Sequence, residues 1–424
     1  MKALTKISIG FLALAAAALW FTSCSSEDVA SGTNQGKMSS LTLTINTGKS
    51  MGSRATDWTT TDPAGSDKTT TENKINRVAI GIFSNSGAVK TIVELTPGIS
   101  GTNSLSTDAT NATAKIVTSS LVANDEVLVA INAPSGRFTG CQDKAAFMQK
   151  TETAAEALAN STDAQVATNI PMFGSATLSG DGSSFNASVS VIHMIAKVSL
   201  TSLKVDFKAG SAYADAVFTP KAVFLINVPN SFQFDNTTET NGDLKAWLSA
   251  GYEHGWGTFA TNYDANTENS SASATFIGST FAKYLTTSEL AVKTLQGVAG
   301  GSDASYASDD KSVCFFYTMP NGQDDDKATK LVIAGLFKAT GVPEKVVYYP
   351  LFLNAKVNDT GTGYVPAFDG SKAKKVYPNK NYNCKVVIRN IGADSPNTNL
   401  DPQTASITIT VKDFDSADQT TEFN

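Results

Sequence analysis

Few residues in this chain have the types and spacing that catalysis requires. Histidine, the side chain that most often transfers protons near neutral pH, occurs twice among 424 residues, as His193 and His254. The sequence contains no nucleophile motif G-x-S-x-G, no zinc motif H-E-x-x-H and no phosphate loop G-x-x-x-x-G-K. We therefore expect a protein that is not an enzyme and that has no cofactor.

Other polar groups that could bind a metal ion or a sugar have simpler interpretations. His193 lies inside an apolar run with no clustered partner, which is typical of a packed or surface-facing histidine rather than a ligand. Asp324, Asp325 and Asp326 are adjacent and lack the alternating spacing of a Ca²⁺ loop, so they indicate a solvated acidic turn. We expect no metal site. His254 lies in the aromatic segment 252–256, where loop packing is the default and contact with a glycan is the alternative.

The cysteines do not form an obvious framework. They are Cys24, Cys141, Cys314 and Cys384, with no C-x-x-C pair among them. If Cys24 is used elsewhere, three remain, and an odd number cannot be fully paired. Cys314 and Cys384 lie in strand-like runs. Buried free thiols are favoured, and a disulfide between these two stays open.

Composition predicts a globular all-β protein. Hydrophobic residues make up 41% and charged residues 17%, and the net charge of -6 argues against nucleic acid as a partner. Many short apolar runs separated by turn signals favour β-sandwiches. One segment, 143–159, is rich in good helix formers and predicts a helix. The clearest predicted strands are residues 74–83, 126–132, 192–203, 222–228, 330–338, 345–353 and 383–391.

Two segments near opposite ends of the chain share one pattern. Leu41, Leu43 and Ile45 alternate with threonine, as do Ile407, Ile409 and Val411, and this period of two predicts half-buried strands. After the first segment comes a loop rich in Gly and Ser that carries Arg54, and then a polar run. A protease could enter this flexible connection. The sequence thus suggests that the first strand is removable and that the last one can replace it.

The N-terminus predicts export. Lys2 and Lys6 precede an apolar run, residues 7–21, that is too short for a comfortable transmembrane helix. The run ends in small residues followed by Cys24, which resembles a bacterial lipoprotein cleavage box in which the cysteine is lipidated. The next residues, 25–28, are similar to the acidic signal that sends Bacteroidetes lipoproteins to the cell surface.

Together, these features resemble the Bacteroidales fimbrillin family, which includes the major subunits of type V pili. The resemblance rests on the lipoprotein signal, on Arg54 after a first strand, and on two motifs at residues 192–198 and 377–388. It extends over essentially the whole chain through diffuse patterns. Lys197 and Phe414 stand where many relatives have Arg and Trp.

The resemblance implies two tandem transthyretin-like β-sandwich domains and assembly by donor-strand exchange. It divides the chain into a signal peptide 1–24, a propeptide 25–54, and domains 55–200 and 201–424 with the donor strand near 406–414. It also implies a lipid on Cys24 that anchors the precursor in the outer membrane, and an Arg-specific protease that cuts between Arg54 and Ala55. The implied partners are other copies and related subunits in a head-to-tail fimbria at the cell surface.

Two other functions stay open. A minor anchor or tip subunit belongs to the same family, but an anchor is expected to keep its first strand and a tip to lack a donor strand. The second alternative is a glycan-binding surface lipoprotein, for which the aromatic segment 252–256 is the hint.

Overall fold

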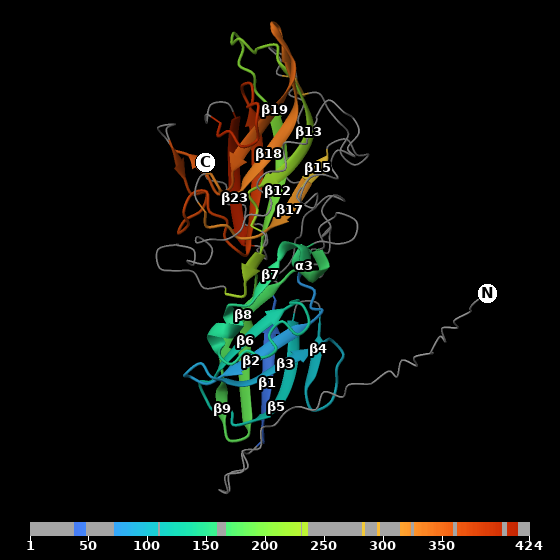
Figure 1. Cartoon of the computed structure of the whole chain (residues 1–424), viewed down its shortest axis with the longest axis vertical. Coiled ribbons are helices and arrows are strands. Elements are labelled where there is room, and N and C mark those ends of the chain that lie inside the picture. Colours follow the sequence, from blue (N-terminus) through green and yellow to red (C-terminus); the bar gives the residue numbers. More distant parts are fainter. Residues whose placement is uncertain are drawn as a thin grey trace, which may run out of the picture. The chain divides into compact units, whose positions relative to one another are not determined.

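The computed structural model of the chain shows an all-β fold (Figure 1). It describes residues 38–47, 72–108, 111–158, 167–229, 231–235, 282–284, 295–296, 314–323, 326–358, 363–400 and 405–413. The strands form four larger sheets, which pack in pairs, and two short two-stranded ribbons. The predicted all-β sandwich class is therefore confirmed.

The first sandwich contains two five-stranded sheets. The first of them, the β1 sheet, has the order β4 (Ser104–Thr107), β5 (Asn111–Ser119), β1 (Met38–Asn46), β10 (Ser184–Ser190) and β9 (Ser179–Asp181). The second, the β2 sheet, has the order β11 (Ile192–His193), β8 (Met172–Thr177), β6 (Glu126–Ile131), β2 (Val78–Phe83) and β3 (Val89–Leu95). Alternate side chains of both sheets meet in one buried apolar cluster, which is the core of this sandwich.

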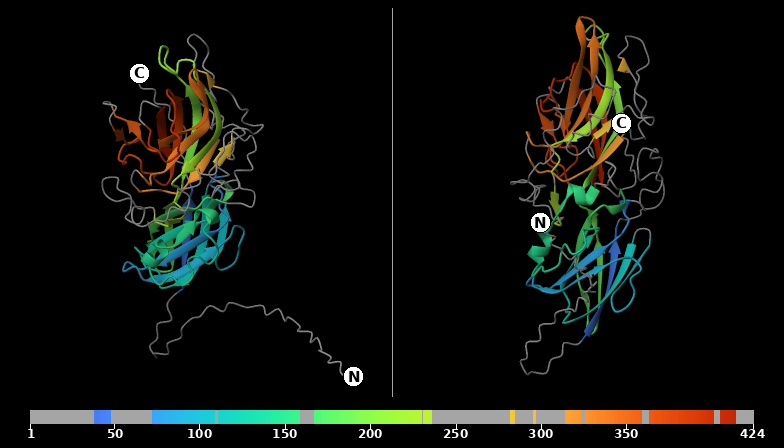
Figure 2. Two further views of the ribbon diagram at one scale, coloured as in Figure 1. Left: turned by 45° about the horizontal axis from the view of Figure 1, so that its top comes forward. Right: turned by 45° about the vertical axis from the view of Figure 1, so that its right-hand side comes forward.

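The second sandwich is built in the same way (Figure 2). One sheet, the β22 sheet, has the order β17 (Cys314–Thr318), β12 (Ala196–Val205), β22 (Lys380–Ile388) and β23 (Ala405–Asp413). The facing sheet has the order β15 (Ala282–Tyr284), β13 (Val217–Ile226), β18 (Lys330–Ala339) and β19 (Val342–Phe352), with β16 (Leu295–Gln296) also on β13. Pro220 in β13 cannot donate to a ladder, and the register with β18 shifts there as a bulge.

Along β2 and β6, the β2 sheet is buried on both faces. Its inner face joins the core of the first sandwich, whereas Ala79, Phe83 and Leu128 on its outer face belong to the apolar cluster that also fills the second sandwich. This explains why β2 and β6 read as nearly continuous apolar runs instead of alternating ones. Two small ribbons complete the sheets: β7 (Thr151–Thr153) with β14 (Ser231–Gln233), and β20 (Lys356–Val357) with β21 (Tyr364–Val365).

The predicted single helix at 143–159 is wrong. Asp143 caps a short helix, α2 (Lys144–Met148), by accepting a hydrogen bond from the Ala146 amide at 2.7 Å. The chain then extends as β7 before a second helix, α3 (Ala154–Leu158); the single-turn 3₁₀ helix η2 (Ala167–Asn169) follows later. Pairing of β7 with β14, which comes about eighty residues later, overrides the helical propensity of this segment.

The predicted change of domain between residues 200 and 201 lies inside β12, which pairs with β17 and β22 on its two sides. The division into domains 55–200 and 201–424 stays a prediction.

Candidate strand-exchange site

β1 is a central strand of its sheet. Along its whole length it pairs antiparallel with β5, and from Ser40 to Asn46 it also pairs parallel with β10. Both backbone edges of β1 are therefore satisfied by hydrogen bonds. A chain without β1 would have two unpaired edges, one on β5 and one on β10, with a gap one strand wide between them.

The side chains of β1 separate cleanly between its two faces. Leu41, Leu43 and Ile45 are fully buried, and Thr42 and Thr44 are exposed. Each buried side chain contributes about 1.5–3 kcal/mol relative to exposure, so these three side chains stabilise β1 in the groove that it fills. The floor of the groove is the inner face of the β2 sheet, and its side walls are the core residues opposite these three side chains on β5 and β10: Ala112, Ala114, Ile116, Phe185, Ala187 and Val189.

β23, which carries the predicted donor residues, lies at the edge of the β22 sheet. It pairs with β22 alone, and Ile409 lies opposite Cys384. Ile409 is buried, whereas Ile407 and Val411 are only half-buried against the second core. An edge strand can leave its sheet by breaking one ladder, so β23 is held less firmly than β1.

The two strands match in length and pattern. Each is nine residues long. When Leu41 is aligned with Ile407, Leu43 aligns with Ile409 and Ile45 with Val411, and threonine aligns with threonine between them. The volumes match to within one methylene, at the last position.

The predicted processing residues, Cys24, Arg54 and Ala55, lie outside the described residues. Thr47 and Glu72 are the described residues on either side of segment 48–71, which contains Arg54. Both are buried, so the segment is joined to the folded protein by a fixed residue at each end.

A buried polar cluster that could not be predicted from the sequence surrounds Glu72. Oε1 of Glu72 accepts hydrogen bonds from Nζ of Lys197 at 2.8 Å and from the hydroxyl of Tyr317 at 2.6 Å. The backbone oxygen of Glu72 lies 3.2 Å from Nε2 of His193. His193 is fully buried, so of the two expected placements, packed and surface-facing, it has the packed one. Glu72 and Tyr317 gave no sequence signal because their partners are far away along the chain.

The two motifs that carried the family resemblance meet beside this cluster. The amide of His193 donates to Oδ1 of Asn379 at 3.3 Å, and the amide of Asn379 donates to the carbonyl of Ile195 at 2.9 Å. Asn379 takes a positive φ of 57°, which asparagine tolerates better than most residues. Residues 192–198 and 377–382 thus fit together as one structural unit.

Cys314 and Cys384 do not form a disulfide in the structure. Both thiols are free and buried, as is Cys141. Cys314 and Cys384 lie on strands to either side of β12, each opposite Leu200. Two strand spacings separate them by about 10 Å, beyond the reach of a disulfide. Burial also raises the pKa of the Cys384 thiol, so it stays protonated.

Glu152 on β7 is a second buried acid. It is fully buried, and within the described part of the chain neither carboxylate oxygen has a hydrogen-bond partner. Burial, reinforced by the nearby Glu156, raises the pKa of Glu152 to about 8, against a smaller opposing effect of Arg137. Arg137 itself forms an ion pair with Glu156.

The other candidates from the sequence gain no support. His254, Asp324 and Asp325 lie outside the described residues. Among the residues that are described, no group of three or more His, Cys, Asp or Glu could hold a metal ion. None of the described helices is long and apolar enough to cross a membrane.

Comparisons with known proteins agree on the fold. No family model and no curated protein matches the chain. Solved structures do match over most of it. A candidate cell adhesion protein from Bacteroides eggerthii is 18% identical, with 89% of this chain and 97% of that chain covered and a TM-score of 0.54. A candidate cell adhesion protein from Parabacteroides distasonis is 13% identical, with 89% and 100% covered and a TM-score of 0.56. The chain shares its fold with these Bacteroidales proteins, in agreement with the predicted resemblance to fimbrillins.

Proposed function

We propose that this chain is a structural subunit of a cell-surface fimbria, cleaved after Arg54 and assembled by strand exchange. The observation that carries the proposal is the contrast between β1 and β23. β1 fills a groove with two backbone edges and is connected onward through the Arg54 segment, while β23 has the same pattern and sits at a sheet edge. The cell adhesion proteins that share the fold support a role in adhesion.

Strand exchange would give the donor strand β23 two hydrogen-bonded neighbours in place of one. In its own sheet β23 pairs only with β22, and two of its three aliphatic side chains stay half-buried. In the place of β1 it would pair with both β5 and β10, and all three side chains would be fully buried. Full burial contributes about 1.5–3 kcal/mol per side chain, so the donor gains both apolar contacts and backbone hydrogen bonds.

Cleavage after Arg54 starts assembly and leads to a head-to-tail filament. The groove is closed by β1 until the connection at Arg54 is cut, after which β1 is held only by non-covalent contacts. Because each subunit then offers a groove and a donor, the contact is head-to-tail and produces an open filament. The lipid on Cys24 leaves with β1, so the same cut releases the subunit from the outer membrane.

The test is N-terminal sequencing of surface filaments, combined with two variants. Filament subunits should begin at Ala55. Arg54→Ala and Arg54→Lys should both leave a lipidated precursor that does not polymerise, because the lysine keeps the charge but not the specificity of the protease. The neighbouring Ser53→Ala variant should polymerise normally. Filaments of normal yield from Arg54→Ala would contradict the proposal, and filaments whose subunits retain residues 38–46 would identify an anchor.

A further inference from the structure

Residues 389–400, which we call the arm, lead from β22 towards β23 and are fastened to the facing sheet. Ala393 in the arm lies opposite Tyr348 on β19, the last strand of that sheet. The amide of Tyr348 donates to the carbonyl of Ala393 at 2.8 Å, and the amide of Ala393 donates to the carbonyl of Tyr348 at 2.9 Å. The arm therefore pairs with β19 as a short strand would.

Side chains hold the arm near both of its ends. Near its start, the hydroxyl of Tyr349 donates to the carbonyl of Asn390 at 2.9 Å. Near its end, Nζ of Lys330 on β18 donates to Oδ1 of Asn399 at 2.7 Å. Lys330 is only 2% exposed, so detaching Asn399 takes an acceptor away from a buried ammonium. Such a loss costs more than the loss of a hydrogen bond between neutral groups.

Gly392 lets the arm lie close against β19. A Cβ atom at this position would lie 2.7 Å from the carbonyl oxygen of Tyr348, so a larger residue would push the arm away. Ile391 and Leu400 pack against the apolar cluster that fills the second sandwich. The arm is thus a fitted part of its own sandwich.

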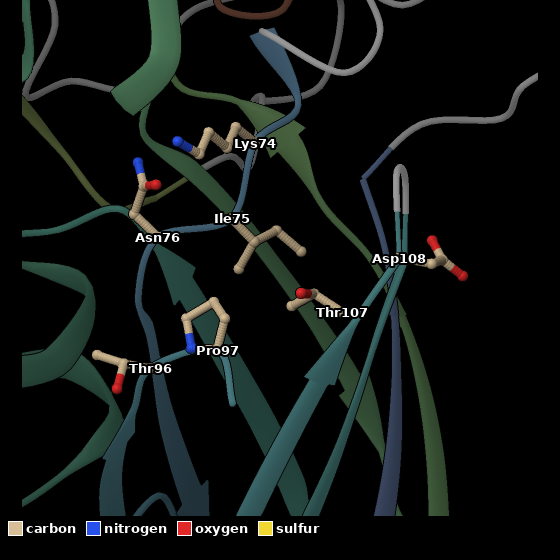
Figure 3. Close-up of a pocket in the computed structure, with 7 residues that line it drawn as sticks. All are labelled: Lys74, Ile75, Asn76, Thr96, Pro97, Thr107 and Asp108. Carbon is tan, nitrogen blue, oxygen red and sulfur yellow. The ribbon is translucent and has the colours of Figure 1, made fainter. Parts of the chain in front are cut away.

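Strand exchange can replace the contacts of β23 but not those of the arm. The groove left by β1 is one strand wide, and its two backbone edges belong to β5 and β10. A pocket of 490 Å³ also opens in the first sandwich, lined by the segment before β2, the residues after β3 and the end of β4 (Figure 3). No residue of β1, β5 or β10 lines this pocket, so it does not extend the groove. An arm that followed β23 would therefore lose its bonds to β18 and β19 without compensation.

The short stretch of chain between the arm and β23 limits the distance to the receiving copy. β23 begins at Ala405, five residues after Leu400. Five residues span at most about 18 Å when fully extended. With the arm in place, the groove that receives the start of β23 must lie within this distance of Leu400.

We propose that the arm stays attached to its own sandwich during strand exchange and forms the surface on which the receiving second copy of this chain docks. The inference rests on the proposed strand exchange and adds a contact surface to it. The exposed side chains of the arm, which include Asp394, Asn397 and Thr398, then lie between consecutive subunits.

A covalent link between the arm and β19 tests whether the arm stays attached. Lys345 and Asp394 form an exposed ion pair at 2.8 Å, so the double variant Lys345→Cys with Asp394→Cys can be joined by a short bis-maleimide. Cys141, Cys314 and Cys384 are buried and should not react. After cleavage, the linked chain should form as many filaments as the same variant blocked with N-ethylmaleimide. Loss of filaments on linking would overturn the proposal.

A second link tests the proposed function separately. Lys385 on β22 lies opposite Thr408 on β23, so joining Lys385→Cys to Thr408→Cys holds β23 in its own sheet. This linked chain should form no filaments, whereas its N-ethylmaleimide control should form them. Filaments from the linked chain would contradict the exchange of β23 itself, whatever the first link shows.

Alkylation of single cysteines tests the docking surface. Thr398→Cys should react with an alkylating reagent in the precursor and should be protected in filaments. Lys338→Cys, which replaces an exposed lysine on β18, is the control and should react in both. Reaction of both cysteines in filaments, or equal protection of both, would overturn the docking surface. Thermal unfolding of the precursors checks that all variants fold.

Discussion

Glu72 and Lys197 form a buried ion pair in which the ammonium lies 2.8 Å from the carboxylate and both side chains are at most 2% exposed. Tyr317 donates to the same carboxylate oxygen. Glu72 is the first described residue after the segment that contains Arg54, and Lys197 and Tyr317 lie on neighbouring strands of the β22 sheet. The pair thus fixes the point at which the chain re-enters the fold after the predicted cleavage site.

Removing one member of this pair should destabilise the protein strongly. Lys197→Met leaves a buried carboxylate without its cation, which costs about 3–5 kcal/mol of unfolding free energy. The double variant Glu72→Gln with Lys197→Met removes both charges and should recover most of this loss. Urea unfolding of the three proteins measures both effects. A loss below about 1 kcal/mol in Lys197→Met would show that the ion pair does not stabilise the fold.

Truncating the donor strand on its inward face should impair assembly. Ile409→Ala removes the side chain that would fill the position of Leu43, and such truncations cost about 2–5 kcal/mol in a packed core. Thr410→Ala on the outward face is the matched control and should assemble normally. Filament yield after equal expression is the measurement. Circular dichroism of the precursors should show that both variants fold, and equal filament yields would exclude β23 as the donor.

Much of the fold could be predicted because it depends on local pattern. The threonine alternation around Leu43 and Ile409 correctly gave strands with one buried face. The same pattern cannot show whether a strand is central or at an edge. β1 is central because β10, more than a hundred residues later, pairs with it in parallel, and the sequence has no signal for such a long-range pairing. The prediction of one helix at 143–159 was wrong for the same reason, because the sequence has no signal for the long-range pairing of β7 with β14.

The site was predicted only in part. The residues of both strands were found, yet the walls of the groove were not, because β5 and β10 reach β1 through pairings between segments far apart in the sequence. Glu72 was missed because an isolated glutamate gives no sign of burial. The sequence left a disulfide between Cys314 and Cys384 open, because only the strand order shows that β12 lies between them, with Leu200 opposite both.

The mature chain should contain three free thiols. Cys141, Cys314 and Cys384 are buried and unbridged, so an alkylating reagent should add nothing to the folded protein. After unfolding in denaturant without any reductant, mass spectrometry should find three added groups on the chain that the proposed cleavage leaves, which starts at Ala55. A single added group would show that two of the thiols are oxidised to a disulfide.

Glu152 should make stability fall as the pH rises. Its pKa is about 8 in the folded protein against an ordinary value of 4.5, because the buried carboxylate is costly to ionise. The folded state therefore keeps this proton when the unfolded state loses it. Stability from this group is fully present below about pH 4.5, declines by about 1.4 kcal/mol per pH unit up to about pH 8, and is constant above.

The variant Glu152→Gln removes the titration and should flatten this decline. Unfolding free energies measured from pH 5 to pH 9 should then converge with the wild type at low pH and exceed it at pH 9, by on the order of 4 kcal/mol. Glu344→Gln, which changes an exposed carboxylate on β19, is the control and should keep the wild-type slope. Parallel curves for Glu152→Gln and the wild type would mean that the carboxylate is solvated or paired in solution. Because β7 holds Glu152 and pairs with β14, such a result would also place the β7–β14 ribbon in contact with water.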